Sequence, residues 1–248
     1  MISNLVLKIK RRETPFYQKL YTVAKQIRGM SLPSYKPIHL PLYHLHVGIK
    51  NFVNKAIQGL WIVPLFKARC NSCGSGLRLP NGMPEIIGNP KLVIGDNVQI
   101  LDSTLASGHV FDNPTIQIGN QTVIGYHSDI SAAKLVIIGR NTLIAKDCFI
   151  ADNDGHPVSP RRRINHESVN KNEVDPVHIG NTCWIGTGSY ILKGANIGDG
   201  CIVAANSVVL KGTYPDNSLV AGNPAKVIYQ FDENGNRSNT TELFTKIM

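Results

Sequence analysis

One histidine stands in a setting that suits proton transfer. His156 lies in the motif DGHPVSP, inside a polar insertion of 27 residues, 151–177, which holds three prolines and three consecutive arginines. Loops of this length within a compact domain are usually functional. Imidazole titrates close to neutral pH, which matches it to taking a proton from a hydroxyl group. His156 is therefore the candidate general base, and a solvent-facing loop histidine is the alternative interpretation.

Other polar side chains near this motif are candidates for supporting roles. Asp152 and Asp154 are close enough in sequence to orient the imidazole ring, although a backbone carbonyl would serve equally well. Arg161, the first of the three arginines, is a candidate for holding an anionic acceptor, or it only keeps the loop soluble. His127 and Asp129 fall in the coil that precedes the insertion, where they would line the acceptor side.

The elements that must position these residues form a six-residue repeat. Aliphatic residues recur six apart, and glycine often follows them. The members of the repeat are Ile94, Ile100, Ile118, Ile124, Ile130, Ile138, Ile144, Ile150, Ile179, Ile185, Ile191, Ile197, Val203 and Val209. Neither an α-helix, with a period of 3.6, nor a strand, with a period of 2, produces this spacing. It predicts a mainly β fold over 69–230, a parallel β-helix with its aliphatic residues inside and small residues at its turns.

The first 68 residues lack the repeat and have helical periodicity. We expect amphipathic helices there, one of them over Pro15–Met30, with a linker over Ser31–His44 because that segment holds three prolines. Their apolar faces either cap the open end of the β-helix or lie on a membrane, and capping is the more usual arrangement. Residues 231–248 are expected to form a tail with a short helix.

Charge is concentrated at the amino terminus. Residues 1–70 hold 12 Lys or Arg and one acid, whereas the remainder holds 14 basic and 16 acidic residues. Attraction to anionic lipid headgroups is one use of such a segment, and a solvated basic face is the other. The nearly neutral remainder gives no reason to expect nucleic acid.

Composition also indicates a compartment. The sequence has no run of about 18 apolar residues and no secretory-signal pattern. It has five cysteines, an odd number, which favours reduced thiols. We expect a cytoplasmic protein, at the inner face of the membrane if its basic segment binds lipid.

Four segments resemble the hexapeptide-repeat acetyltransferases, especially galactoside and maltose O-acetyltransferases and the O-acetyltransferases of polysaccharide biosynthesis. The segments are DGHPVSP, HIGNTCWIGTGSYILKGANIGDG, AANSVVLKG and VAGNPAKVI. The resemblance implies a left-handed β-helix that forms homotrimers with shared active sites. It further implies transfer of acetyl from acetyl-CoA, without a metal, to a hydroxyl of a sugar. The acceptor would be a capsule, exopolysaccharide or O-antigen precursor, either free or lipid-linked.

The resemblance also carries roles onto single residues. It implies that His156 is the catalytic base and that the backbone N–H of Thr187 donates to the oxyanion. Asp154, close to His156 in sequence, is the carboxylate predicted to assist it. It places acetyl-CoA along Gly186, Ala204 and Ala205, with Trp184 against its pantetheine arm or against the acceptor, and Lys211 and Lys226 near its phosphates. The alternatives are that Trp184 is a plain hydrophobic edge residue and that the two lysines are only solvated. AANS stands where the family commonly has a glycine-alanine-glycine-serine turn, which leaves the pantetheine contacts open.

Three other functions share this kind of fold. An N-acetyltransferase of an amino sugar nucleotide is closely related, and a non-catalytic scaffold would have no use for the polar insertion. A γ-class carbonic anhydrase needs three metal-binding histidines on neighbouring coils. The intervals here, with 17 residues between His109 and His127 and 28 between His127 and His156, do not match that arrangement. The CNSC segment, Cys70–Cys73, lacks the second cysteine pair of a zinc site.

Overall fold

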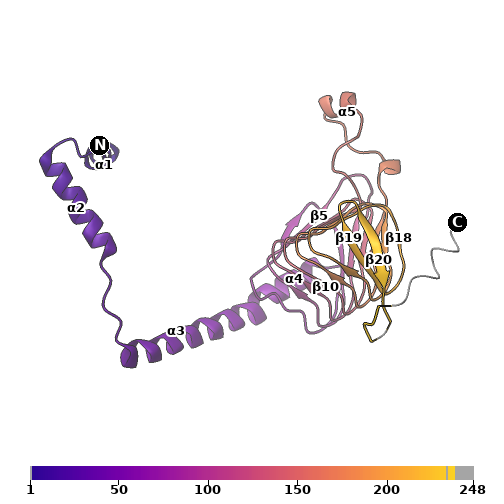
Figure 1. The fold of residues 1–248 in the computed structure, drawn as a ribbon, viewed down its shortest axis with the longest axis horizontal. Helices are drawn as coiled ribbons and strands as arrows, with labels where there is room; N and C mark the ends of the chain where they lie inside the picture. Colours follow the sequence, from indigo (N-terminus) through magenta and orange to yellow (C-terminus); the bar gives the residue numbers. More distant parts are fainter. Residues whose placement is uncertain (1, 233, 238–248) are drawn as a thin grey trace. The chain divides into compact units, whose positions relative to one another are not determined.

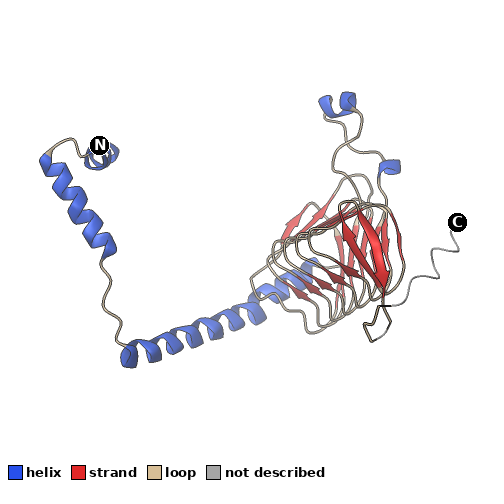
Figure 2. Ribbon diagram, viewed as in Figure 1, coloured by secondary structure: helices blue, strands red, loops and turns tan. Residues whose placement is uncertain are grey.

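A computed structural model describes residues 2–232 and 234–237, so most of the tail predicted for 231–248 lies outside the described residues. By its internal contacts the chain divides into two units, Met1–Phe52 and Val53–Met248. Helices form the amino-terminal part and short strands form the remainder (Figures 1 and 2). No helix among residues 2–232 and 234–237 has both the length and the apolar character needed to cross a membrane.

The helical part begins as the sequence predicts. Its elements are α1 (Ile2–Arg11), α2 (Pro15–Gly29), α3 (Lys36–Ile57), a π-helix (Gln58–Ile62) and α4 (Val63–Arg69). The hydroxyl of Thr14 caps α2 by accepting from the N–H of Tyr17 at 3.3 Å, and Pro15 occupies the first turn. A proline is tolerated there because its missing N–H would have had no partner within the helix.

The predicted linker over Ser31–His44 is wrong for its second half. Helix α3 begins at Lys36 and continues through Pro41. Pro37 lies in the first turn, where a missing N–H costs nothing, and Pro41 removes one hydrogen bond from a helix of 22 residues. His39 also supports the start of α3, because its Nδ1 accepts from the N–H of Tyr35 at 2.9 Å.

The rest of the chain is a solenoid of three parallel sheets. We call these the first, second and third sheets, and their orders are β1-β3-β6-β9-β12-β15-β18, β4-β7-β10-β13-β16-β19-β20 and β2-β5-β8-β11-β14-β17. All pairings are parallel except β19 with β20. The strand bounds are β1 (Ser72–Cys73), β2 (Glu85–Ile87), β3 (Lys91–Ile94), β4 (Gln99–Ile100), β5 (Thr104–Ser107), β6 (Thr115–Ile118), β7 (Val123–Ile124), β8 (Asp129–Ala132), β9 (Leu135–Ile138), β10 (Leu143–Ile144), β11 (Phe149–Ala151), β12 (Val177–Ile179), β13 (Trp184–Ile185), β14 (Tyr190–Ile191), β15 (Ala195–Ile197), β16 (Ile202–Val203), β17 (Val208–Val209), β18 (Gly212–Tyr214), β19 (Ser218–Gly222) and β20 (Ala225–Gln230). The predicted left-handed parallel β-helix is confirmed.

The aliphatic members of the repeat fill the interior of this solenoid. Ile124, Ile144 and Ile185 stack in neighbouring strands of the second sheet, and every member named above is buried. Cys148, Cys183 and Cys201 are buried between the coils, as their repeat positions predict. The amino-terminal end of the core is closed by α4, whose Phe66 is fully buried in the same cluster. Of the two predicted uses of the helices, capping is therefore performed by this last helix.

Glycine follows the aliphatic residue because the next coil leaves no space for a side chain. A Cβ built on Gly125 would lie 2.5 Å from the carbonyl carbon of Ala145, and one on Gly139 would lie equally close to that of Gly180. The left-handed conformation falls two residues further along the chain, at His127 with φ of 51° and at Asn141 with φ of 54°. The glycines are thus required by close approach of the backbone, and the turn itself is made by the residue two positions later.

Neighbouring residues of one strand provide a matched test of this register. Ile144 is fully buried, whereas the adjacent Leu143 is 43% exposed. Ile144→Ala should lower the free energy of unfolding by roughly 2–5 kcal/mol because it leaves a cavity in the stack. Leu143→Ala should change it by no more than about 0.5 kcal/mol. Urea unfolding at one protein concentration measures both, and equal effects would contradict the register.

Candidate active site

The insertion that carries His156 is anchored by a buried carboxylate at its first turn. Asp152 is fully buried and accepts three successive backbone N–H groups, from Ala133 at 2.6 Å, Lys134 at 2.6 Å and Leu135 at 2.7 Å. These donors lie in the eight-residue interval between Ile130 and Ile138, where the repeat is two residues too long. Asp152 therefore holds the extra turn of the preceding coil. The sequence had made it a candidate for orienting the ring of His156, and the structure does not give it that role.

The second half of the insertion, which leads back to the solenoid, packs on the turn that Asp152 holds. Val169 and Val174 form a small buried cluster with Ala133, and Phe111 packs against it. Within the loop the Arg162 guanidinium binds Glu173 at 2.9 Å and Glu167 at 3.1 Å. The backbone N–H of Asn170 and the Arg162 side chain hold the pKa of the Glu173 carboxyl below its usual range. The insertion, which also contains α5 (Pro160–Ile164), is thus an ordered excursion from the solenoid (Figure 1).

His156 itself is exposed and makes no hydrogen bond with any residue that the structure describes. The Asp154 carboxylate binds the ammonium group of Lys193 at 2.6 Å, and Lys193 also donates to the carbonyl of Glu173 at 3.1 Å. Asp154 therefore fixes the insertion to the coil after it, and its predicted assistance to His156 stays a prediction. The sequence analysis did not identify Lys193 as a partner of the insertion. The pairing of Ile150 with Ile191 places Lys193 level with Asp152 in the neighbouring coil.

A groove of about 590 Å³ crosses the outer face of the third sheet beside the insertion. It is lined by the carboxylate-bearing Asp129 and Asp154, the ring of Phe149, and the backbone at Gly155. The structure thus brings Asp129 together with the start of the insertion. His127 is not among the lining residues, because it occupies the preceding turn between Asp102 and Asp147, with ring nitrogens 3.7 and 3.4 Å from their carboxylates.

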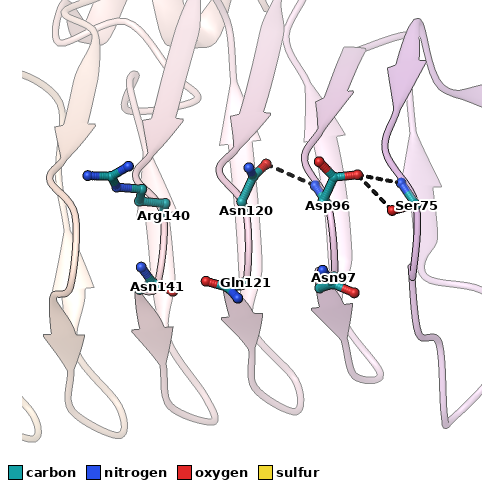
Figure 3. A pocket seen from close by; sticks show the side chains of 7 residues that line it. All are labelled: Ser75, Asp96, Asn97, Asn120, Gln121, Arg140 and Asn141. Carbon is teal, nitrogen blue, oxygen red and sulfur yellow. Dashed lines mark hydrogen bonds between the residues drawn. The ribbon is translucent and has the colours of Figure 1, made fainter.

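Two corners of the solenoid differ in how their backbone N–H groups are used. Between the first and second sheets, Asp and Asn side chains accept the N–H of the preceding coil: Asp96 from Ser75 at 2.7 Å, Asn120 from Asp96 at 2.9 Å, and Asp199 from Asn181 at 2.8 Å. Figure 3 shows the first two of these bonds. Arg140 has no side-chain acceptor for the N–H of Asn120, and the ladder resumes where Arg140 donates its own N–H to Asn181 at 3.0 Å.

The corner between the second and third sheets has no such ladder. Backbone N–H groups at one position of successive coils there find no acceptor among the described residues, among them those of Tyr126, Lys146, Thr187 and Ala205. We call these groups the open N–H row. Thr187, predicted as the oxyanion donor, is one of them. The absence of Asp and Asn after Gly125, Ala145, Gly186 and Ala204 was a readable signal of this row.

Four of the residues predicted to hold acetyl-CoA, Trp184, Gly186, Ala204 and Ala205, lie at or beside the open N–H row, whereas Lys211 lies at the corner between the third and first sheets. Gly186 lies directly against the next coil, where its Cβ would be 2.6 Å from the nitrogen of Ala205. Ala204 and Ala205 therefore continue the same corner, and Trp184 is 52% exposed on β13 just before it. Lys211 binds Asp175 at 3.0 Å, and Lys226 is exposed on β20.

Arg161 and its two neighbours have different surroundings. Arg163 donates to the carbonyls of Pro157 and Val158, at 3.0 and 2.6 Å, and thereby braces the chain just after His156. Arg162 is occupied by the two glutamates. The Arg161 side chain is exposed and has no partner among the described residues, so its guanidinium is available to an acceptor.

Comparison with known proteins identifies the family of the chain. A family model described as "Bacterial transferase hexapeptide (six repeats)" matches residues 176–211. A Staphylococcus haemolyticus protein named as an acetyltransferase is 32% identical over 146 residues, which cover 51% of this chain and 69% of that protein. The chain belongs to the hexapeptide-repeat acetyltransferase family.

Further relatives of this hexapeptide-repeat acetyltransferase include a Saccharomyces cerevisiae protein, also named as an acetyltransferase, at 36% identity over 52% of this chain and 64% of the relative. The polysialic acid O-acetyltransferase of Escherichia coli O1:K1 is 38% identical over 45% of this chain and 35% of its own length. The chain therefore spans less than two thirds of these two relatives.

Solved structures show the same fold. A galactoside acetyltransferase in complex with coenzyme A aligns with a TM-score of 0.51 and 23% identity, covering 85% of this chain and 92% of that one. The N-acyltransferase AntD from Bacillus cereus, in complex with dTDP and 3-hydroxybutyryl-CoA, aligns with a TM-score of 0.54 and 17% identity, covering 74% and 93%.

The two carboxylates at the start of the insertion should differ sharply in their effect on stability. Asp152→Ala leaves three backbone N–H groups without an acceptor and should lower the free energy of unfolding by about 3 kcal/mol or more. Asp154→Ala breaks a half-exposed ion pair and should cost no more than about 1 kcal/mol. Urea unfolding at a fixed protein concentration compares them, and a harmless Asp152→Ala would refute the anchoring role.

Proposed function

We propose that this protein transfers an acetyl group from acetyl-CoA to a hydroxyl of a sugar, within a precursor of a surface polysaccharide. The observation that carries the proposal is the anchored insertion, which presents an unpaired imidazole on a chain of the hexapeptide-repeat acetyltransferase family. The sugar acceptor is supported by the relative that acts on polysialic acid. Arg161 and Asp129 are the side chains proposed to contact the acceptor.

The open N–H row fits the acyl donor. Bound acetyl-CoA supplies the acetyl thioester, and its pantetheine arm carries amides whose carbonyls need donors. Tyr126, Lys146 and Ala205 offer such donors, and Gly186, Ala204 and Ala205 leave space for close approach. Trp184 would pack beside the arm, while Lys211 and Lys226 would attract the phosphates.

His156 and the backbone N–H of Thr187 have separate roles in the proposed reaction. The imidazole of His156 takes the proton of the sugar hydroxyl as its oxygen forms the new C–O bond. The N–H of Thr187 donates to the former carbonyl oxygen, which becomes negatively charged. When the C–S bond breaks, the imidazolium returns the proton to the departing sulfur. The products are the acetyl ester and the free thiol, and no group of the protein becomes acylated.

The geometry of a single chain supports a shared site. The insertion leaves the solenoid at the corner between the third and first sheets, whereas the open N–H row lies at the corner between the second and third sheets. A second copy that faces the insertion with its open N–H row would bring the two together. We propose a homotrimer in which each active site combines His156 of one subunit with the corner at Thr187 of another.

His156→Ala should reduce the rate of thiol release from acetyl-CoA by roughly 100- to 10,000-fold, because a positioned base contributes that much. The assay uses the full chain with a panel of neutral and acidic oligosaccharides, and an amino sugar nucleotide tests for N-acetylation. His166→Asn, which alters another exposed histidine of the same insertion, should retain the wild-type rate. Unchanged turnover of the His156→Ala protein would overturn the proposed base.

Mixed subunits test the shared site. His156→Ala and Ala205→Tyr should each abolish activity alone, the second because an exposed tyrosine blocks the corner. Subunits unfolded and refolded together should regain activity, since an intact His156 of one subunit then meets an intact corner of another. Sedimentation should give about three times the chain mass of 27.2 kDa. No recovery from mixed trimers would place both elements in one chain.

A further inference from the structure

The amino-terminal unit exposes an unusual amount of apolar surface. No described side chain between residues 5 and 52 is buried. Large apolar side chains are exposed on all three helices, at Leu5, Val6, Leu7, Phe16, Leu20, Val23, Ile27, Ile38, Leu40, Leu42, Tyr43, Leu45, Ile49 and Phe52. Single exposed hydrophobic residues are ordinary, but a continuous series marks a surface that binds something. We call residues 2–52 the N-terminal arm.

The exposed residues of the arm share helix faces. On α2, Phe16, Leu20, Val23 and Ile27 follow one another at intervals of four, three and four residues, which places them on one side of the helix. Helix α3 has a similar face, whose exposed residues follow at intervals of three, four and three: Leu42, Leu45, Ile49 and Phe52. Each helix thus offers an apolar face, although neither contributes a residue to the buried core of the solenoid.

The positive charge of the arm favours an anionic surface over a second copy of the arm as the partner of these apolar faces. Nine Lys or Arg residues lie between residues 1 and 52, and Glu13 is the one acid there. Glu13 is already paired with Arg11, 3.6 Å away. Packing arms from several copies together would bring like charges close without acids to neutralise them. An anionic surface removes that repulsion, at a gain of about fivefold in binding for each basic residue.

Exposed aromatic residues in the arm and just after it also favour a lipid surface as the partner. Tyr35 and Tyr43 are exposed in and before α3, and Trp61, in the π-helix that follows it, is 65% exposed. Tyrosine and tryptophan favour the boundary between lipid and water because they combine an apolar ring with a polar tip.

We propose that the N-terminal arm binds the surface of an anionic lipid bilayer, with its apolar helix faces in the headgroup region and its basic side chains on the lipid phosphates. Amphipathic helices with basic polar faces bind membranes in this manner. The partner is the bilayer itself, so the inference does not depend on the proposed acetyl transfer. Its consequence for that proposal is that acceptors carried on lipid would be held near the enzyme.

The test is co-sedimentation of the full chain with vesicles. The protein should bind vesicles of phosphatidylglycerol and phosphatidylcholine, and bind pure phosphatidylcholine at least tenfold more weakly. Lys8→Gln, Arg11→Gln and Arg12→Gln together should weaken anionic binding about 100-fold. The matched control, Lys91→Gln, Lys134→Gln and Arg140→Gln, removes the same charge from the solenoid and should bind as wild type.

The apolar faces are tested separately. Phe16→Ser with Ile27→Ser should weaken vesicle binding at least tenfold, whereas Met83→Ser with Ile228→Ser, which alters exposed apolar residues of the solenoid, should not. All these side chains are exposed, and circular dichroism verifies that each variant keeps its helices and strands. Equal binding to both vesicle types would overturn the proposal. So would arm variants that change the sedimentation mass but leave vesicle binding intact, because the arm would then bind another copy.

Discussion

The spacing between successive coils is the constraint on which the rest of the structure depends. Parallel strands in hydrogen-bonding contact lie about 4.8 Å apart, and the solenoid repeats that distance from coil to coil. Aliphatic side chains such as Ile124 and Ile144 fill the interior at this spacing. At the corners the backbones come so close that Gly125 and Gly139 have no space for a methyl group. A long excursion from this repeat is accommodated only at a corner, and there the insertion of 151–177 leaves the solenoid.

The same constraint shapes the candidate site. Where Asp and Asn side chains cover the N–H groups of a corner, as they do for Ser75 and Asp96, those groups are already satisfied and offer nothing to a ligand. A corner made of glycine and alanine leaves its N–H groups unpaired, as at Thr187 and Ala205. Unpaired donors held on a rigid backbone suit carbonyl oxygens and developing negative charge. The insertion carries His156, the proposed base, whose ring makes no hydrogen bond with any described residue.

The sequence predicted the solenoid well because its signal is local and periodic. The six-residue spacing identified the buried aliphatic residues, the corners and the loop that bears His156. It could not predict the role of Asp152, because the partners of that carboxylate are backbone groups of the preceding coil, brought close by the extra residues after Ile130. It also misjudged the start of α3, since a proline removes one hydrogen bond while the remaining turns of a long helix are unaffected. The open N–H row was visible as an absence of Asp and Asn but gained meaning only from the hydrogen bonds of the other corner.

A crystal structure of the protein with coenzyme A and an acceptor oligosaccharide tests the central claim most directly. The account predicts the thiol at the corner of Gly186, Thr187 and Ala205, with His156 of a neighbouring subunit within about 2.6–3.2 Å of the acceptor hydroxyl. Coenzyme A bound elsewhere, or His156 remote from every such corner in the assembled protein, would contradict it.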